Sequence, residues 1–100
     1  MNSGESFRLD SSVPDTVTVS GTLSFATATA ALAALNTALG QGSRHRLDLA
    51  GVRNCDSAGL ACVLAALADA AGQGRSVSVL NAPAGMLALA QVSGVAPLLG

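Results

Sequence analysis

The segment VRNCDSAGLACVLAAL, residues 52–67, begins with polar residues and continues into the most hydrophobic part of the chain. Asp56 and Ser57 stand at the boundary between the two parts. A catalytic serine, a helix cap and a regulated docking point would each place an Asp-Ser pair at such a boundary. The rest of the sequence is therefore needed to choose among these three interpretations.

The hydrophobic part of this segment predicts a helix, and the residues before it predict a strand. The helix runs over Ser57–Ala71, and the GQG that follows ends it. Upstream, His45–Gly51 alternates Leu47 and Leu49 with polar residues, which is typical of a strand. Residues 52–59 are predicted as a loop. The apolar face of the helix consists of Leu60, Val63, Leu64, Leu67 and Ala71.

Another helix is predicted over Phe25–Leu39, with Thr22 or Ser24 as its N-cap and Gly40 at C′. Strands Phe7–Asp10 and Thr16–Gly21 are expected to form a hairpin at one edge of a sheet. The expected apolar stripe of this helix consists of Phe25, Ala28, Leu32, Leu35 and Leu39.

Downstream, the pattern predicts a strand over Arg75–Asn81 and a third helix over residues 82–94, with Pro83 near its first turn. The tail VAPLLG, residues 95–100, is expected to pack back on the sheet. In the third helix, Leu87, Ala90 and Gly94 lie on one side and Met86, Leu89 and Val92 lie nearby.

The order of these elements, with strands separated by helices, predicts one α/β domain over residues 1–100. Right-handed crossovers place the helices mostly on one face of a mixed sheet of about four strands. The core must consist largely of Leu and Val, because only Phe7 and Phe25 are aromatic and much of the apolar content is Ala.

Charge and hydropathy exclude several classes of function. The formal net charge is -1 and the chain has no Lys, so it lacks the clustered positive charge of a nucleic-acid-binding protein. Arg44 and Arg46 flank His45, with Arg53 further on; they predict a solvated edge, or alternatively a contact for an acidic partner. With no signal peptide and no uninterrupted membrane span, we expect a cytoplasmic protein without direct membrane insertion.

The two cysteines, Cys55 and Cys62, lack the spacing and the neighbouring histidines of a metal site, so neither metal nor cofactor is expected. They are expected to be reduced, buried or half-buried apolar residues. A serine hydrolase is also disfavoured, because Cys55 replaces the first glycine of a nucleophile elbow and the single His45 precedes Ser57. Without Lys or a GxGxxG motif, no nucleotide site is predicted. No catalytic residue is therefore assigned.

Two interpretations of the Asp-Ser pair remain, and they are compatible. Asp56 or Ser57 is expected to cap the helix, although Leu60 stands where the Glu of a capping box would follow a Ser57 cap. Ser57 would also sit near free backbone N–H groups, which suit a phosphate. A phosphate on Ser57 would add negative charge and repel a partner packed against the neighbouring apolar residues.

The chain resembles the STAS domain family, because HRLDLAGV, NCDSAGL and RSVSVLNAPAGMLALAQVSGVAPLL follow the family's order and spacing. In anti-sigma-factor antagonists, which share this fold, the first Ser of a D-S-[ST]-G-L loop is phosphorylated by a kinase that is also the anti-sigma factor. Ser57 aligns with that residue, while Ala58 replaces the usual second Ser or Thr.

The resemblance is greater to the MlaB-like STAS subunit of Mla-type phospholipid ABC transporters, where DSAGLA-like motifs and endings like LAQVSGVAPLL, residues 89–99, are common. It implies a non-catalytic subunit that binds the cytoplasmic ATPase at the inner membrane and supports transport that maintains outer-membrane lipid asymmetry. The alternative is an anti-sigma-factor antagonist with Ser57 as the phosphoacceptor.

The predicted docking edge covers residues 55–63. Ser57 is its central polar contact and candidate phosphoacceptor, Asp56 and Gly59 shape the loop, and Gly59 allows close backbone approach. Leu60 is expected to supply contact or core packing. The predicted partner-binding residues are Cys55, Asp56, Ser57, Ala58, Gly59, Leu60 and Ala61.

Overall fold

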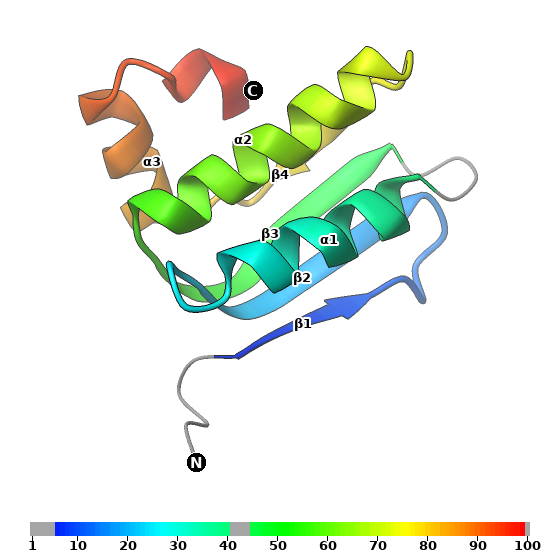
Figure 1. Ribbon diagram of the computed structural model, residues 1–100, viewed down its shortest axis with the longest axis horizontal. Helices are drawn as coiled ribbons and strands as arrows, with labels where there is room; N and C mark the ends of the chain where they lie inside the picture. The colour runs from blue at the N-terminus through cyan, green and yellow to red at the C-terminus, as the bar shows by residue number, and fades with distance from the viewer. Residues whose placement is uncertain (1–5, 41–44, 100) are drawn as a thin grey trace.

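The computed structural model describes residues 6–40 and 45–99, whose strands form one mixed sheet in the order β1-β2-β3-β4 (Figure 1). β1 and β2 pair antiparallel as the predicted hairpin, and β2, β3 and β4 are parallel. The strands are β1 (Phe7–Asp10), β2 (Thr16–Leu23), β3 (Arg46–Cys55) and β4 (Ser78–Leu80); the helices are α1 (Ala28–Leu39), α2 (Ser57–Gly72), α3 (Ala84–Val92) and the 3₁₀ helix η1 (Ala96–Leu99).

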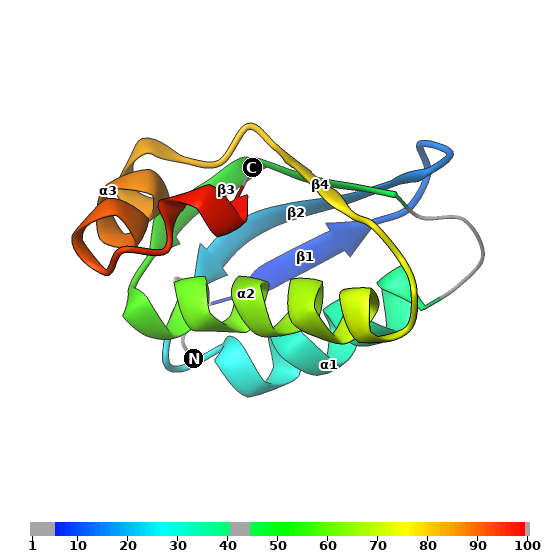
Figure 2. The same cartoon turned by 90° about the horizontal axis from the view of Figure 1, so that it is seen from above.

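Two consecutive crossovers determine where the helices lie. The chain moves from β2 to β3 and then to β4 in the same direction across the sheet, so right-handed connections place α1 and α2 on the same face. Figure 2 shows α1 and α2 side by side on this face, while α3 and η1 lie toward the β4 side. The predicted α/β fold, with four strands and three helices, is confirmed.

The core lies between the sheet and the α1–α2 layer. Alternating β-branched and Leu residues of β2 and β3 face inward, and the Ala- and Leu-rich helices pack against them. The tail contributes Leu99, which is 5% exposed and belongs to the same cluster, so the tail packs back as predicted. The largest fully buried side chains are Leu23, Leu35, Leu39, Leu47, Leu49, Met86, Val17, Val19 and Val63.

The start of α1 differs from the prediction. β2 continues to Leu23, a turn follows, and α1 begins at Ala28 with Thr27 as its N-cap residue. The Thr27 hydroxyl accepts a hydrogen bond from the Ser24 N–H at 2.9 Å, so it stabilises the turn rather than the helix end. Phe25 fits the helical spacing but lies in this turn with 85% of its surface exposed, so its predicted core position is wrong.

The end of β3 is also a correction. Residues 52–55, predicted as loop, continue the strand and pair with Gly21, Thr22 and Leu23 across a bulged register. Val52 points into the core, whereas the polar residues that follow it are exposed. Pairing with β2 therefore outweighed their loop-like composition.

Smaller differences concern element ends and faces. β4 and α3 are shorter than predicted. Gly40 is the C-cap residue of α1, but its backbone is right-handed, so it is not the left-handed C′ residue. A Cβ at Gly40 would lie 2.9 Å from the Asn36 carbonyl oxygen, which explains the glycine. Four residues predicted on apolar helix faces, Ala71, Leu87, Val92 and Gly94, are exposed. The residues of the GQGS turn beyond Gly40, and Gly100, lie outside the described residues.

Candidate functional site

Asp56 is the residue that organises the end of β3 and the start of α2. Its Oδ1 accepts a hydrogen bond from the Gly59 N–H at 2.9 Å, which caps the first turn of α2. Its Oδ2 accepts a hydrogen bond from the Phe25 N–H at 3.0 Å. The Gly59 bond, followed by the Phe25 bond, holds the pKa of Asp56 below its usual value. Asp56, not Ser57, is therefore the helix cap.

Ser57 is the first residue of α2 and is exposed to solvent. His45 lies just before the other end of β3, with its Nε2 3.9 Å from Asp15 Oδ1. Because β3 has ten residues, it separates His45 from Ser57 by about 30 Å. His45 thus cannot activate the Ser57 hydroxyl, which removes the serine-hydrolase arrangement considered from the sequence.

Gly59 belongs to the first turn of α2 and is buried against the end of β2. A Cβ at this position would collide with the Leu23 carbonyl group. The Asp56 N–H also donates to the Leu23 carbonyl oxygen, at 3.2 Å. The close backbone approach expected of Gly59 is therefore present, and it brings the start of α2 against the end of β2.

The remaining predicted docking residues separate into a buried group and a solvent-facing group. Leu60 is only 4% exposed and belongs to the core, so of its two expected roles it has the packing one. Cys55 is half-buried and its Sγ donates to the Asp56 carbonyl oxygen at 3.3 Å. Burial, followed by the charge of Asp56, raises the pKa of Cys55 to about 11, so the thiol stays protonated near neutral pH. Ala58 is partly exposed and Ala61 is exposed.

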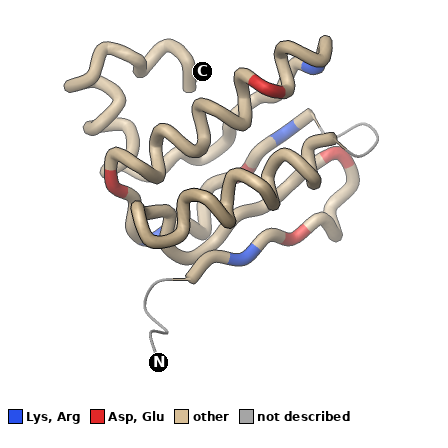
Figure 3. The backbone as a smooth tube through the Cα atoms, in the orientation of Figure 1, with Lys and Arg blue, Asp and Glu red and all other residues tan. Residues whose placement is uncertain are grey.

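Ala58 and Ala61 line a groove between α1 and α2. The groove has a volume of about 300 Å³, and its walls are small or apolar side chains. None of the described residues that line it carries a charge, and α1 has no charged residue (Figure 3). The lining residues are Ala28, Thr29, Leu32, Ala58, Ala61, Cys62 and Ala65.

The α1 wall of this groove and Phe25 were not predicted as site residues. The exposed Phe25 lies on the turn that Asp56 holds against the start of α2. Alternating small residues in ATAALAALNTAL were the only sequence signal for the α1 wall, and they are equally typical of any Ala-rich helix. The pairing of α1 with α2 depends on the fold, so sequence spacing did not reveal it.

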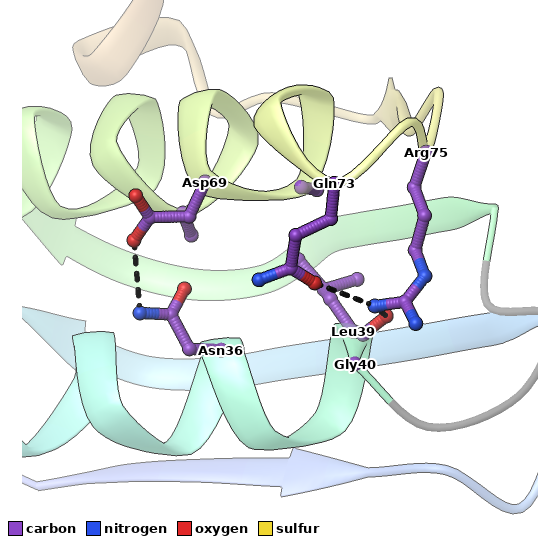
Figure 4. Close-up of a pocket in the computed structure, with 8 residues that line it drawn as sticks. Asn36, Leu39, Gly40, Asp69, Gln73 and Arg75 are labelled. Atoms are coloured by element: carbon purple, nitrogen blue, oxygen red, sulfur yellow. Dashed lines mark hydrogen bonds between the residues drawn. The ribbon is translucent and has the colours of Figure 1, made fainter.

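A second, polar pocket of about 140 Å³ lies between the C-terminal ends of the same two helices (Figure 4). The Asn36 side-chain amide donates to Asp69 Oδ2 at 3.0 Å. The Arg75 guanidinium donates to the Leu39 carbonyl oxygen at 3.2 Å and to Gln73 Oε1 at 3.0 Å. The polar groups of this pocket thus bind one another and hold the helix ends together.

The basic residues of the sequence do not form one cluster. Arg46 starts β3 and Arg53 lies near its end, so about 23 Å of strand separates them. Arg44 lies outside the described residues. Within residues 6–40 and 45–99, no helix is long and apolar enough to cross a membrane. No group of three or more His, Cys, Asp or Glu side chains in this part of the chain is arranged to hold a metal.

Solved structures of SpoIIAA are similar to this chain. The anti-sigma factor antagonist SpoIIAA in its unphosphorylated form has a TM-score of 0.69 at 23% identity, over 93% of this chain and 84% of its own. The phosphorylated form of SpoIIAA, a Bacillus cell fate determinant, gives a TM-score of 0.66 at 24% identity, over 93% and 87% of the two chains. These likenesses establish the shared fold.

A comparison with curated protein sequences gives no significant match. The family model described as the MlaB STAS domain matches residues 8–100, which is nearly the whole chain. The chain therefore belongs to the STAS domain family, in its MlaB-like group.

Proposed function

We propose that this STAS domain is a non-catalytic subunit that binds the cytoplasmic ATPase of an Mla-type phospholipid ABC transporter. The observation that carries the proposal is the uncovered apolar groove between α1 and α2, which opens beside the exposed Ser57. The MlaB-like family match supports this partner class. In this role the domain lies at the inner membrane through its partner and supports transport that maintains outer-membrane lipid asymmetry.

The groove suits a helix of the partner. Its walls are mainly Ala side chains, which let a second helix approach closely, with Leu32 providing the largest apolar surface. Burying apolar surface contributes about 25 cal/mol per Å². Phe25, on the turn that Asp56 holds against the start of α2, is proposed as an aromatic anchor, because aromatic residues including Phe are enriched in the cores of protein interfaces.

Ser57 is proposed as the central polar contact of this interface, with Ala58 and Ala61 beside it. Ser57 is the first residue of the 16-residue helix α2, so its hydroxyl is available for a hydrogen bond to the partner. Asp56 and Gly59 act indirectly, because they hold the start of α2 and the Phe25 turn in place.

An anti-sigma-factor antagonist regulated at Ser57 is the alternative proposal. Its support is the exposure of Ser57 at the N-terminus of α2 and the likeness to SpoIIAA, which is also known in a phosphorylated form. A phosphate on Ser57 would bring about −1.5 to −2 charges to the groove mouth. The partner would then be an anti-sigma factor that is also the kinase.

Affinity capture from the native lysate, read out by mass spectrometry, tests the two partners. The variants are Ser57→Asp, Ala61→Glu and the control Ala68→Glu, which adds the same charge to an exposed α2 position outside the groove. We expect wild type and Ala68→Glu to recover an ABC-type ATPase, and Ala61→Glu and Ser57→Asp to lose it.

Recovery of a kinase-type anti-sigma factor, together with phosphoserine at position 57, would favour the alternative. An ABC-type ATPase held equally by all four proteins would keep the partner but contradict the proposed interface. Recovery of neither class after crosslinking in the cell would contradict both proposals.

A further inference from the structure

The face of the sheet opposite α1 and α2 contains a separate depression. Figure 2 shows no helix over β1 and β2 on this face. The depression has a volume of about 310 Å³ and lies across β1, β2 and β3. It shares no lining residue with the α1–α2 groove.

Two arginines, Arg8 and Arg53, and two serines, Ser6 and Ser20, line this depression. Arg8 of β1 pairs with Ser20 of β2, and Ser20 pairs with Gly51 of β3, so the three form one row across the sheet. Arg53 lies two residues beyond Gly51 and also lines the depression. Adjacent strands are about 4.8 Å apart, so Arg8 and Gly51 are separated by about 10 Å. Two Arg side chains can therefore reach a common point above Ser20.

The centre of the row is hollow for a steric reason. A Cβ at Gly51 would lie 2.7 Å from the Cβ of Ser20, so no side chain fits there. Gly21 lines the same depression, and the register between β2 and β3 shifts at this point. Bulges of this kind redirect side chains and often lie next to binding sites.

The positive groups of the depression are available to a ligand. Within the described part of the chain, neither the two guanidinium groups nor the Ser20 hydroxyl makes a hydrogen bond or a salt bridge, although the charge of Arg8 acts on Asp10 and helps to lower its pKa. Asp10, two residues from Arg8 on the same strand, is the nearest carboxylate along β1, and its Oδ1 accepts from the Ser12 N–H at 2.8 Å. Among the residues that the structure describes, no carboxylate lines the depression itself.

We propose that this depression binds a phosphate group. Arg8, Arg53 and Ser20 approach one point from three strands, and a phosphomonoester presents three terminal oxygens, whereas a carboxylate presents only two. Guanidinium groups match phosphate oxygens in charge and in planar, bidentate geometry. The ligand is either a small soluble phosphomonoester or a lipid headgroup of the same chemistry, such as phosphatidic acid. This inference does not depend on the proposed transporter role.

Titration with inorganic phosphate, followed by ¹H–¹⁵N NMR at constant ionic strength, tests the site. We expect saturable shifts at the amides of Ser20 and Gly51. Arg8→Gln and Arg53→Gln should each weaken binding about tenfold, because a hydrogen bond to a charged group is lost. Arg46→Gln is the matched control, since it removes the same charge near the opposite end of β3 and does not line the depression. It should stay within about twofold of wild type.

Two results would overturn the proposal. One is non-saturable shifts that chloride reproduces, or an equal loss in Arg46→Gln, because either would indicate general charge screening. The other is binding of a hexaglutamate peptide as tight as that of phosphate, which would indicate an acidic protein partner. The NMR spectra of the variants show directly whether each one is folded.

Vesicle co-sedimentation distinguishes the two sources of phosphate. Phosphatidylcholine vesicles with and without phosphatidic acid are the probes. Sedimentation only with phosphatidic acid, lost in Arg53→Gln but retained in Arg46→Gln, assigns the site to a lipid headgroup. Saturable NMR binding of inorganic phosphate without sedimentation assigns it to a soluble phosphomonoester. Absence of both kinds of binding contradicts the proposal.

Discussion

The contact between α1 and α2 is polar at one end and apolar at the other. At the C-terminal ends of the helices, Asn36, Asp69, Gln73 and Arg75 form hydrogen bonds with one another or with backbone (Figure 4). Near the start of α2, an uncovered apolar groove lies between the two helices, next to Ser57. The polar end has its partners inside the chain, whereas the apolar end has none.

This difference indicates where a partner gains free energy. Replacing the hydrogen bonds of the polar end with bonds to a partner would bring little net gain, because each bond formed replaces one that is lost. Covering the apolar groove removes hydrophobic surface from water without breaking an internal contact. We therefore propose the apolar end as the docking site, while the hydrogen bonds of the polar end hold the two helices together.

The largest expected effect is that of Gly59→Ala at the groove end. The added Cβ would collide with the Leu23 carbonyl group, so α2 must move away from β2. We expect a loss of about 2–3 kcal/mol in the free energy of unfolding, measured by urea denaturation.

Gly85→Ala is the control for that change, because Gly85 lies in α3 and a Cβ there meets no atom within 4 Å. It should stabilise the protein by about 0.5–1 kcal/mol. Equal stability of Gly59→Ala and wild type would contradict the close approach of α2 to β2.

A smaller loss is expected for Asp56→Ala, which removes the cap of α2 and the bond to the Phe25 N–H. Loss of an N-cap costs about 1 kcal/mol. Thermal unfolding followed by circular dichroism measures this loss. Ser57→Ala serves as the control, because Ser57 is not the cap, and it should remain within about 0.5 kcal/mol of wild type. A larger loss in Ser57→Ala than in Asp56→Ala would reverse the two roles.

Acid should weaken the same contact. The bonds from Gly59 and Phe25 lower the pKa of Asp56 in the folded state, so its contribution is fully present above the ordinary value of 3.8. That contribution is lost as the pH falls through the lower folded-state pKa. Asp10, whose pKa is lowered by its bond to Ser12, adds to the same acid dependence. Urea titrations below pH 5 should therefore show a shallower loss of stability in Asp56→Asn than in wild type.

The smallest effect is expected at the polar end. Asn36→Ala removes the hydrogen bond to Asp69, which is exposed to solvent, so we expect a loss of about 0.5 kcal/mol. Partner capture should not change, because Asn36 lies outside the groove. If Asn36→Ala abolished capture while Ala61→Glu did not, the assignment of the two ends would be exchanged.

The candidate site was partly predictable from the sequence. The sequence limited the N-cap of α2 to Asp56 or Ser57, because an acceptor side chain must precede the first apolar turn of a helix. Ala58 and Ala61 were predicted at the docking edge, and both face the groove. The predicted core position of Phe25 was wrong, because a 3–4 spacing of apolar residues cannot distinguish the start of a helix from the turn before it. The continuation of β3 through Arg53 and Asn54 was missed, because strand pairing with β2 is not visible in composition.

By itself, the sequence determined the order of the elements, the α/β class and the start of α2 at Ser57, because these depend on local periodicity and capping. Only the tertiary structure decided which surfaces face each other. It placed α1 against α2 to create the groove, and it brought Arg8 beside Ser20 and Arg53 on the open face of the sheet. The physical reason is that these juxtapositions arise from strand pairing and crossover handedness between segments far apart in the chain, whereas sequence patterns report only neighbours along it.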